Sequence, residues 1–132
     1  MLLVATIRAT DGVWAGEDSG QCRPRTWLGS TLGIAADWKL NAAVTKTSKS
    51  LKVLVTERAC AGGSSAKGRI AKPRISYEED RIVITIGVTP LKGQQDCQAN
   101  KATSLTVTLS EAVGDRRLYD GGPYPPIEVE QP

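Results

Sequence analysis

The fold is decided by the stretch IVITIGV at residues 82–88. Its isoleucines fall at every second position and Val83 lies on the opposite face, which is typical of a strand with apolar contacts on both sides. Pro90 ends the stretch, because proline has no N–H to donate to a sheet ladder. We therefore predict a central β-strand here, with the other segments arranged around it.

Short alternating segments lie on both sides of this strand. Residues 38–44 and 51–56 each carry apolar side chains at every second position, and the polar residues 47–49 between them predict the turn of an antiparallel hairpin. Further segments with strand character are residues 2–9, 75–77, 105–109 and 116–120. About seven short strands separated by turn residues predict an all-β fold, an antiparallel β-sandwich of the immunoglobulin-like class.

A length of 132 residues fits one domain with a core of its own. We assign residues 1–126 to a single domain and residues 127–132, which follow a proline-rich break, to a C-terminal tail. Residues 1–36 fit the alternating pattern less well, so an appendage is the alternative for them. Within them, residues 26–36 suit a helical turn and an irregular strand equally well, although two glycines weaken a helix.

The composition excludes several kinds of active site. The chain has no histidine, which removes the commonest general base and the commonest metal ligand. It has three cysteines but no Cys-x-x-Cys pair, so neither a nucleophile–histidine mechanism nor a usual zinc site is available. We therefore predict no catalytic residues, no metal and no cofactor. A carboxylate-based hydrolase is the alternative, since the sequence does not show whether two acids face each other across a cleft.

The apolar segments are too short to cross a membrane. No run approaches the roughly 18 apolar residues that a transmembrane helix needs. Residues 1–7 are apolar, but they lack a preceding basic region and a small-residue cleavage site. They therefore suit a strand better than a signal peptide.

Basic residues are concentrated in one part of the chain. The formal net charge is only +3, but residues 46–74 contain eight Lys and Arg residues and a single acid, Glu57. Such a stretch can face a polyanion or a glycan, and it can equally be the solvated surface of strands and loops. Its Gly- and Ser-rich loop offers Ser64, Lys67 and Arg69, which could hold a phosphate or sulfate. A flexible connector is the alternative for this loop, and a nucleic acid is not an expected partner.

Glu57 and Arg58 raise a question of orientation. Neighbouring residues of a strand point to opposite faces, so one of these two charges points inward and needs a partner. We predict Arg116 or Asp115 as the partner of the inward charge. We expect the two residues to form a buried ion pair that holds a loop, and catalysis is the alternative role.

The three tryptophans, Trp14, Trp27 and Trp38, have two interpretations. They can anchor the core, since the chain has no phenylalanine and large side chains must fill its volume. They can alternatively stack on the rings of a bound sugar. We predict the first role.

The cysteine positions predict a disulfide. Cys60 directly follows one strand and Cys97 lies in the loop between two others, so a bridge between them would tie two connections of the sandwich together. Three reduced thiols are the alternative, and Cys22 could also pair with either of the other two. The spacing does not decide between these pairings. If Cys22 is left over, it is free or links two chains.

Six short segments carry a resemblance to a known group of proteins. They are residues 53–63 (VLVTERACAGG), 80–84 (DRIVI), 95–100 (QDCQAN), 109–116 (LSEAVGDR), 120–122 (DGG) and 124–126 (YPP). In this order they resemble uncharacterised exported or lipoprotein-like β-rich proteins of actinobacteria. The resemblance covers residues 38–126 and implies a secreted or cell-envelope setting and a pairing of Cys60 with Cys97. It implies no activity.

These observations predict a non-enzymatic secreted or cell-envelope β-sandwich module with a structural or binding role and a ligand that the sequence does not name. A protein, a polyanion or a glycan is the candidate partner. An anion- or polysaccharide-binding module that uses residues 46–74 is one alternative, and the carboxylate-based hydrolase is the other.

Overall fold

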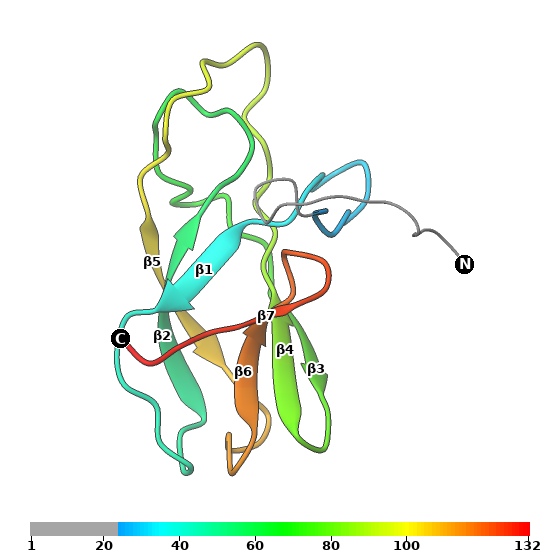
Figure 1. Cartoon of the computed structure of the whole chain (residues 1–132). Helices are drawn as coiled ribbons and strands as arrows, with labels where there is room; N and C mark the ends of the chain where they lie inside the picture. Colours follow the sequence, from blue (N-terminus) through cyan, green and yellow to red (C-terminus); the bar gives the residue numbers. More distant parts are fainter. Residues whose placement is uncertain (1–23) are drawn as a thin grey trace, which may run out of the picture.

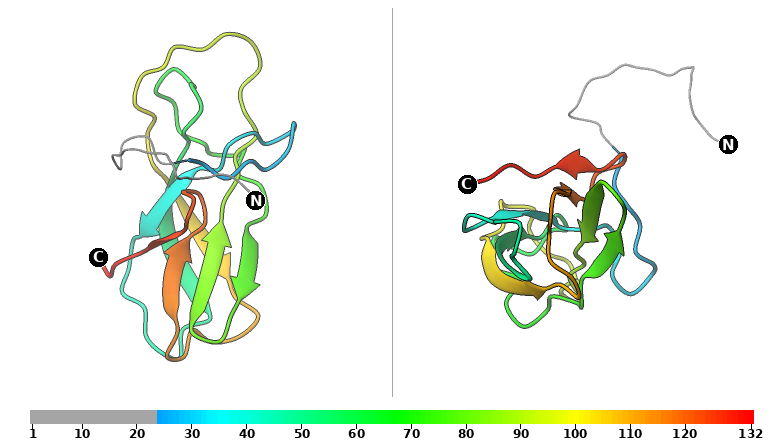
Figure 2. Two further views of the ribbon diagram at one scale, coloured as in Figure 1. Left: turned by 45° about the vertical axis from the view of Figure 1, so that its right-hand side comes forward. Right: turned by 90° about the horizontal axis from the view of Figure 1, so that it is seen from below.

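The computed structural model of the chain describes residues 24–132. The predicted strand at residues 2–9, together with Trp14 and Cys22, lies outside this part. Within it, the strands form two sheets that enclose the core (Figure 1, Figure 2). The strands are β1 Asp37–Leu40, β2 Ser50–Thr56, β3 Arg74–Tyr77, β4 Arg81–Thr85, β5 Thr103–Thr108, β6 Arg117–Asp120 and β7 Ile127–Glu128.

The two sheets differ in how their strands pair. The first has the order β1-β2-β5 and is antiparallel throughout, and it confirms the predicted hairpin as the pair of β1 and β2. The second has the order β3-β4-β6-β7, in which β4 holds the central position that its pattern predicted. No helix in residues 24–132 has the length and apolar character needed to span a membrane.

The pairing of β4 with β6 is parallel, with Ile82 opposite Leu118. The prediction of antiparallel strands throughout is therefore wrong, and an immunoglobulin-like arrangement is not confirmed. The reason is the route of the chain, which leaves β4, enters the first sheet as β5 and returns as β6 by a crossover rather than a hairpin. Alternation of apolar residues specifies the buried face of a strand but not the direction of its neighbour.

The core lies between the two sheets. Its largest fully buried side chains are Leu51, Val53, Val55, Ile82, Ile84, Ile86 and Val107. Burial of each such side chain contributes roughly 1.5–3 kcal/mol. Trp38 joins the core with 5% exposure, as predicted, whereas Trp27 is 63% exposed and the prediction that it anchors the core is wrong. Trp27 instead pairs with Ile34 across a turn at residues 30–32, so residues 26–36 form no helix.

The C-terminal residues are part of the fold. Ile127–Glu128 pairs with β6 as β7, and the carboxamide of Gln131 hydrogen-bonds to the N–H and the C=O of Val44. Residues 127–132, expected to form a tail, thus run from the second sheet across the side of the sandwich towards the chain that follows β1 (Figure 1). A short strand of two residues carries too little alternation to be recognised in a sequence.

Candidate functional site

Within residues 24–132, the two buried charged residues, Glu57 and Asp120, lie at two different places. The first, which we name the disulfide end, consists of the loops at residues 57–73 and 89–102 beyond one end of the sheets (Figure 1). The second, which we name the edge cleft, lies between β1 and residues 127–132. Most of the predicted site residues lie at the disulfide end.

A disulfide joins the two loops of the disulfide end. It links Cys60 to Cys97, with the two Cα atoms 4.3 Å apart, and confirms the predicted pairing. Both cysteines are exposed. The bridge closes a loop of 37 residues, so it restricts the unfolded chain strongly.

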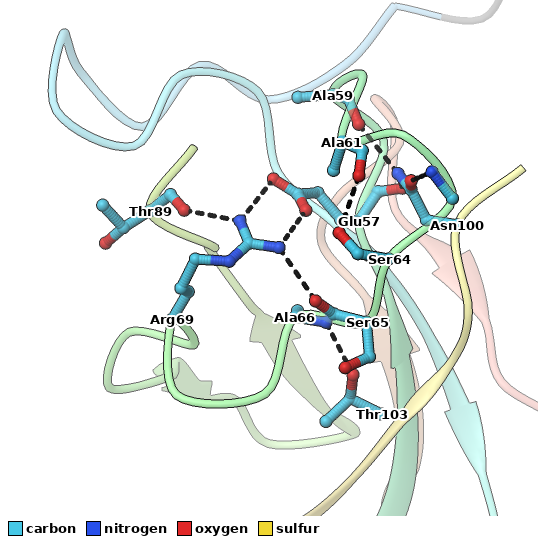
Figure 3. Close-up of polar contacts among 11 residues, drawn as sticks. Glu57, Ala59, Ala61, Ser64, Ser65, Ala66, Arg69, Thr89, Asn100 and Thr103 are labelled. Carbon is cyan, nitrogen blue, oxygen red and sulfur yellow. Dashed lines mark hydrogen bonds and ion pairs between the residues drawn. The ribbon is translucent and has the colours of Figure 1, made fainter. Parts of the chain in front are cut away.

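A buried ion pair holds the same loops from inside (Figure 3). The guanidinium of Arg69 donates to both carboxylate oxygens of Glu57, at 3.1 and 2.8 Å, and also to the carbonyl oxygens of Thr89 and Ser65. The side chain of Glu57 is only 3% exposed. The predicted inward ion pair is confirmed, but the partner of Glu57 is Arg69, and the predicted partner, Arg116 or Asp115, is wrong. A loop brings Arg69 to Glu57, and no periodic sequence pattern specifies the path of that loop.

Asn100 completes this network and was not predicted. Its amide donates to the carbonyl oxygens of Glu57 and Ala59 at 2.9 and 2.8 Å, and its side-chain oxygen accepts the N–H of Gly63 at 3.1 Å (Figure 3). One side chain thus satisfies three backbone groups of the neighbouring loop, which water would otherwise have to satisfy. Its position in the segment QDCQAN, three residues after Cys97, is the only signal that the sequence offered.

Two of the three residues predicted to bind an anion have partners within the protein instead. The hydroxyl of Ser64 donates to the carbonyl oxygen of Ala61 at 2.6 Å, and Arg69 is engaged by Glu57 and two backbone carbonyls. Lys67 is exposed and forms no ion pair within residues 24–132. Only Lys67 of the three is thus free to meet an anion from solution. The described residues also contain no group of three acids or cysteines placed to hold a metal ion.

The edge cleft is an open hollow of about 660 Å³ beside the outermost strand of the first sheet. All four residues of β1 line one side, and residues 127–132 line the other. Leu40, Ile127 and Val129 give it apolar surface, and a charged cluster lies at one end. A cleft that combines apolar walls with a few convergent polar groups is the usual form of a ligand site.

The charged cluster is centred on Asp37. Its carboxylate pairs with Arg25 at 2.6 Å and with Arg58 at 3.1 Å. Arg25 also donates to the carbonyl oxygen of Ala35, but its Nε atom is buried and has no hydrogen-bond partner. A buried donor without a partner carries a desolvation penalty of about 1–3 kcal/mol.

Asp120, at the end of β6, is the buried acid of the cleft. Its two oxygens accept the N–H groups of Trp38 and Gly122 at 3.3 and 2.8 Å. Burial raises the pKa of Asp120 from 3.8 to about 6, the neighbouring Asp37 acts in the same direction, and the two N–H groups and Arg25 act against it. Asp120 therefore titrates near neutral pH, in contrast to an ordinary aspartate.

Gly122 allows Asp120 to reach β1. A Cβ atom at Gly122 would lie 2.8 Å from the carbonyl oxygen of Ala36, and one at Gly121 would clash with the hydroxyl of Thr85. Only glycine therefore permits this close approach of the backbone between the sheets. The segment DGG thus positions a carboxylate at the edge cleft, which sequence reasoning did not detect.

Comparison of the chain with protein families, with curated proteins and with solved structures finds no match. The segments that carry the resemblance noted above supply the disulfide, Glu57, Asn100 and Asp120. In the structure, these residues bond to backbone groups, to a buried guanidinium or to one another. The charged residues Arg25 and Asp37 of the edge cleft lie outside those segments.

Proposed function

We propose that the chain is a non-enzymatic binding module, exported or held in the cell envelope, and that the edge cleft holds its ligand. The observation that carries this proposal is the cleft itself. It is open, it has apolar walls, and one end contains a buried guanidinium nitrogen without a partner and an acid with a raised pKa. Incompletely satisfied polar groups in a cleft are characteristic of sites that meet a ligand.

The carboxylates of the cleft support binding rather than hydrolysis. Both oxygens of Asp37 face guanidinium groups, and both oxygens of Asp120 accept backbone N–H groups. A general acid or nucleophile needs an oxygen that reaches the substrate. Glu128 and Glu130 also line the cleft, and Glu128 pairs with Arg117 at 3.3 Å. Three of the four lining acids thus hold the protein's own groups, which favours a non-enzymatic role, because hydrolysis needs a pair of acids that reach the substrate.

The disulfide supports the proposed setting. Structural disulfides persist mainly in secreted, periplasmic and cell-surface proteins and are rare in the cytosol. Cys60 and Cys97 are exposed, so in a reducing compartment the bridge would be open to attack by thiols. The resemblance to exported and lipoprotein-like proteins points to the same setting.

The basic stretch at residues 46–74 is a weaker candidate. Lys46, Arg58 and Arg69 form ion pairs with Asp115, Asp37 and Glu57. Three of the eight basic residues in this stretch are thus neutralised by acids of the protein itself. This pairing weakens the electrostatic attraction of the stretch for a polyanion.

The test uses the oxidised full chain, labelled for nuclear magnetic resonance and titrated with a panel of short peptides, oligosaccharides and heparin. We expect at least one compound to shift the amides of Lys39, Leu40 and Ile127. Ile127→Trp, which fills the cleft, should weaken this binding, whereas Tyr124→Trp, at an exposed position outside the cleft lining, should not. Shifts confined to the loop around Lys67, with an affinity that falls steeply with salt, would contradict the proposal and favour a polyanion-binding module.

A further inference from the structure

The free edge of β1 presents a defined set of backbone groups. Within the described part of the chain, β1 is the outermost strand of its sheet and pairs with β2 alone. The N–H of Asn41 donates to the carbonyl oxygen of Lys52 at 2.7 Å, which fixes the alternation of bonded and unbonded residues along the pair. Trp38 and Leu40 therefore direct their N–H and C=O groups away from β2, towards the edge cleft.

One side chain already binds this edge, and another binds the chain that follows it. Asp120 accepts the N–H of Trp38. Four residues beyond Leu40, the carboxamide of Gln131 accepts the N–H of Val44 and donates to its C=O, which are the two bonds that a β-strand partner makes. Between these positions, the N–H and C=O of Leu40 have no hydrogen-bond partner within residues 24–132. The edge of β1 thus has one backbone N–H held by a carboxylate and the backbone pair of Leu40 open.

The outer face of the edge is positively charged. Lys39 is exposed and forms no ion pair in the described part of the chain, and Lys52 lies on the same face of the neighbouring strand. Asp37 does not offset these charges, because Arg25 and Arg58 neutralise it. On the opposite wall of the cleft, Glu128 pairs with Arg117, and Glu130 is exposed. A strand that pairs with β1 would therefore gain from acidic side chains on this face.

The cleft side of the same edge is apolar. Ile127 is 42% exposed, and Val129 lies two residues further along the same lining. Because successive side chains of a strand point to opposite faces, an added strand would place alternate residues against this surface. Apolar residues at those positions would cover this lining and remove its apolar surface from water, which favours binding.

We propose that the free edge of β1 binds an extended peptide as an added strand, with acidic side chains towards Lys39 and apolar side chains towards Ile127. The proposal rests on the function proposed above and names the ligand class of the same cleft. In such pairing the backbone ladder supplies affinity, and the alternating side chains supply specificity. β1 has four residues, so at roughly 3.3 Å per residue the paired segment spans about 13 Å.

The probes are a synthetic peptide of alternating Val and Glu, a matched peptide of alternating Val and Lys, and a Val–Glu peptide with N-methyl groups on alternate amides. The Val–Glu peptide is expected to bind and to slow hydrogen exchange at the Leu40 amide. N-methylation on the edge that faces β1 should weaken binding about two- to tenfold, because it removes the peptide N–H that would donate to the carbonyl oxygen of Leu40. The Val–Lys peptide should bind several-fold more weakly than the Val–Glu peptide.

Two matched variants test the charge assignment. Lys39→Glu should reverse the preference between the Val–Glu and Val–Lys peptides, whereas Lys67→Glu, an equivalent change at the disulfide end, should leave it unchanged.

Equal binding of the N-methylated and parent peptides would overturn the proposed strand pairing. If the cleft binds another compound but none of these peptides, the strand proposal falls and the binding module stands. If nothing in the panel shifts the cleft, both fall.

Discussion

The disulfide end and the edge cleft each hold a buried carboxylate near a guanidinium, but the two places satisfy it differently. At the disulfide end, both oxygens of Glu57 meet Arg69, whose terminal nitrogens also donate to backbone carbonyls. In the edge cleft, Asp120 has backbone N–H groups as its partners, and Arg25 keeps a buried nitrogen unbonded. The first arrangement stabilises a loop, whereas the second leaves its polar groups incompletely paired beside an open cleft.

The largest effect is expected from removal of the disulfide. Replacement of Cys60 and Cys97 by serine should lower the free energy of unfolding by about 4 kcal/mol, because the bridge closes a loop of 37 residues. Urea unfolding measures the loss. If the two regions are independent, hydrogen exchange should quicken in residues 57–73 and stay unchanged at Asn41, whose N–H donates to the carbonyl oxygen of Lys52 beside the cleft. Equal acceleration at both places would show that the disulfide end also supports the cleft.

The buried ion pair should give the next largest effect. Arg69→Met leaves Glu57, 3% exposed, without its counter-charge and should lower the free energy of unfolding by about 3 kcal/mol. The double variant Glu57→Leu/Arg69→Met should lose less than Arg69→Met alone, because it leaves no uncompensated charge. Unfolding of the four proteins in urea forms a double-mutant cycle. If the cycle gives no coupling free energy between Glu57 and Arg69, the assignment of this pair as the polar link between the loops would be contradicted.

Asp120 provides a test by pH. Because its folded pKa is raised to about 6 from 3.8, the folded protein binds more protons than the unfolded chain between these values. Its contribution to stability is therefore fully present below pH 3.8 and is lost as the pH rises through 6, by about 2–3 kcal/mol. The measurement is the free energy of unfolding of the wild type minus that of Asp120→Asn at each pH. A difference that does not fall between pH 4 and 7 would contradict the raised pKa.

The sequence allowed much of the core to be predicted. The isoleucines of β4 and the hairpin of β1 and β2 follow from alternation, because burial on one face requires an apolar residue at every second position. The parallel pairing of β4 with β6 did not follow, since the same alternation fits either strand direction. Trp27 was misassigned to the core because size alone does not show on which side of the sheets a tryptophan lies.

The candidate site was less predictable than the core. The disulfide end joins residues whose types already suggested pairing, two cysteines and a strand-end glutamate, although the partner of Glu57 depended on the path of a loop. The edge cleft joins Arg25, Asp37 and Asp120 from distant parts of the chain. None of the three lies in a local pattern that specifies a site, so only the assembled fold brings their charges together.

The smallest effect should come from Gln131, which holds residues 127–132 against the chain after β1. Gln131→Ala removes two hydrogen bonds at an exposed position, so the free energy of unfolding should fall by less than about 1 kcal/mol. The amide of Val44 should nevertheless exchange its hydrogen faster, because Gln131 is its acceptor. Gln131→Glu is the matched control, since it keeps an acceptor for that amide but loses the donor to the Val44 carbonyl. The contrary outcome is unchanged exchange at Val44 in Gln131→Ala, together with continued protection of Leu40 by the Val–Glu peptide. In that case the cleft would not depend on the contact between Gln131 and Val44. Residues 127–132, which form the wall opposite β1, would then be held by β7 alone.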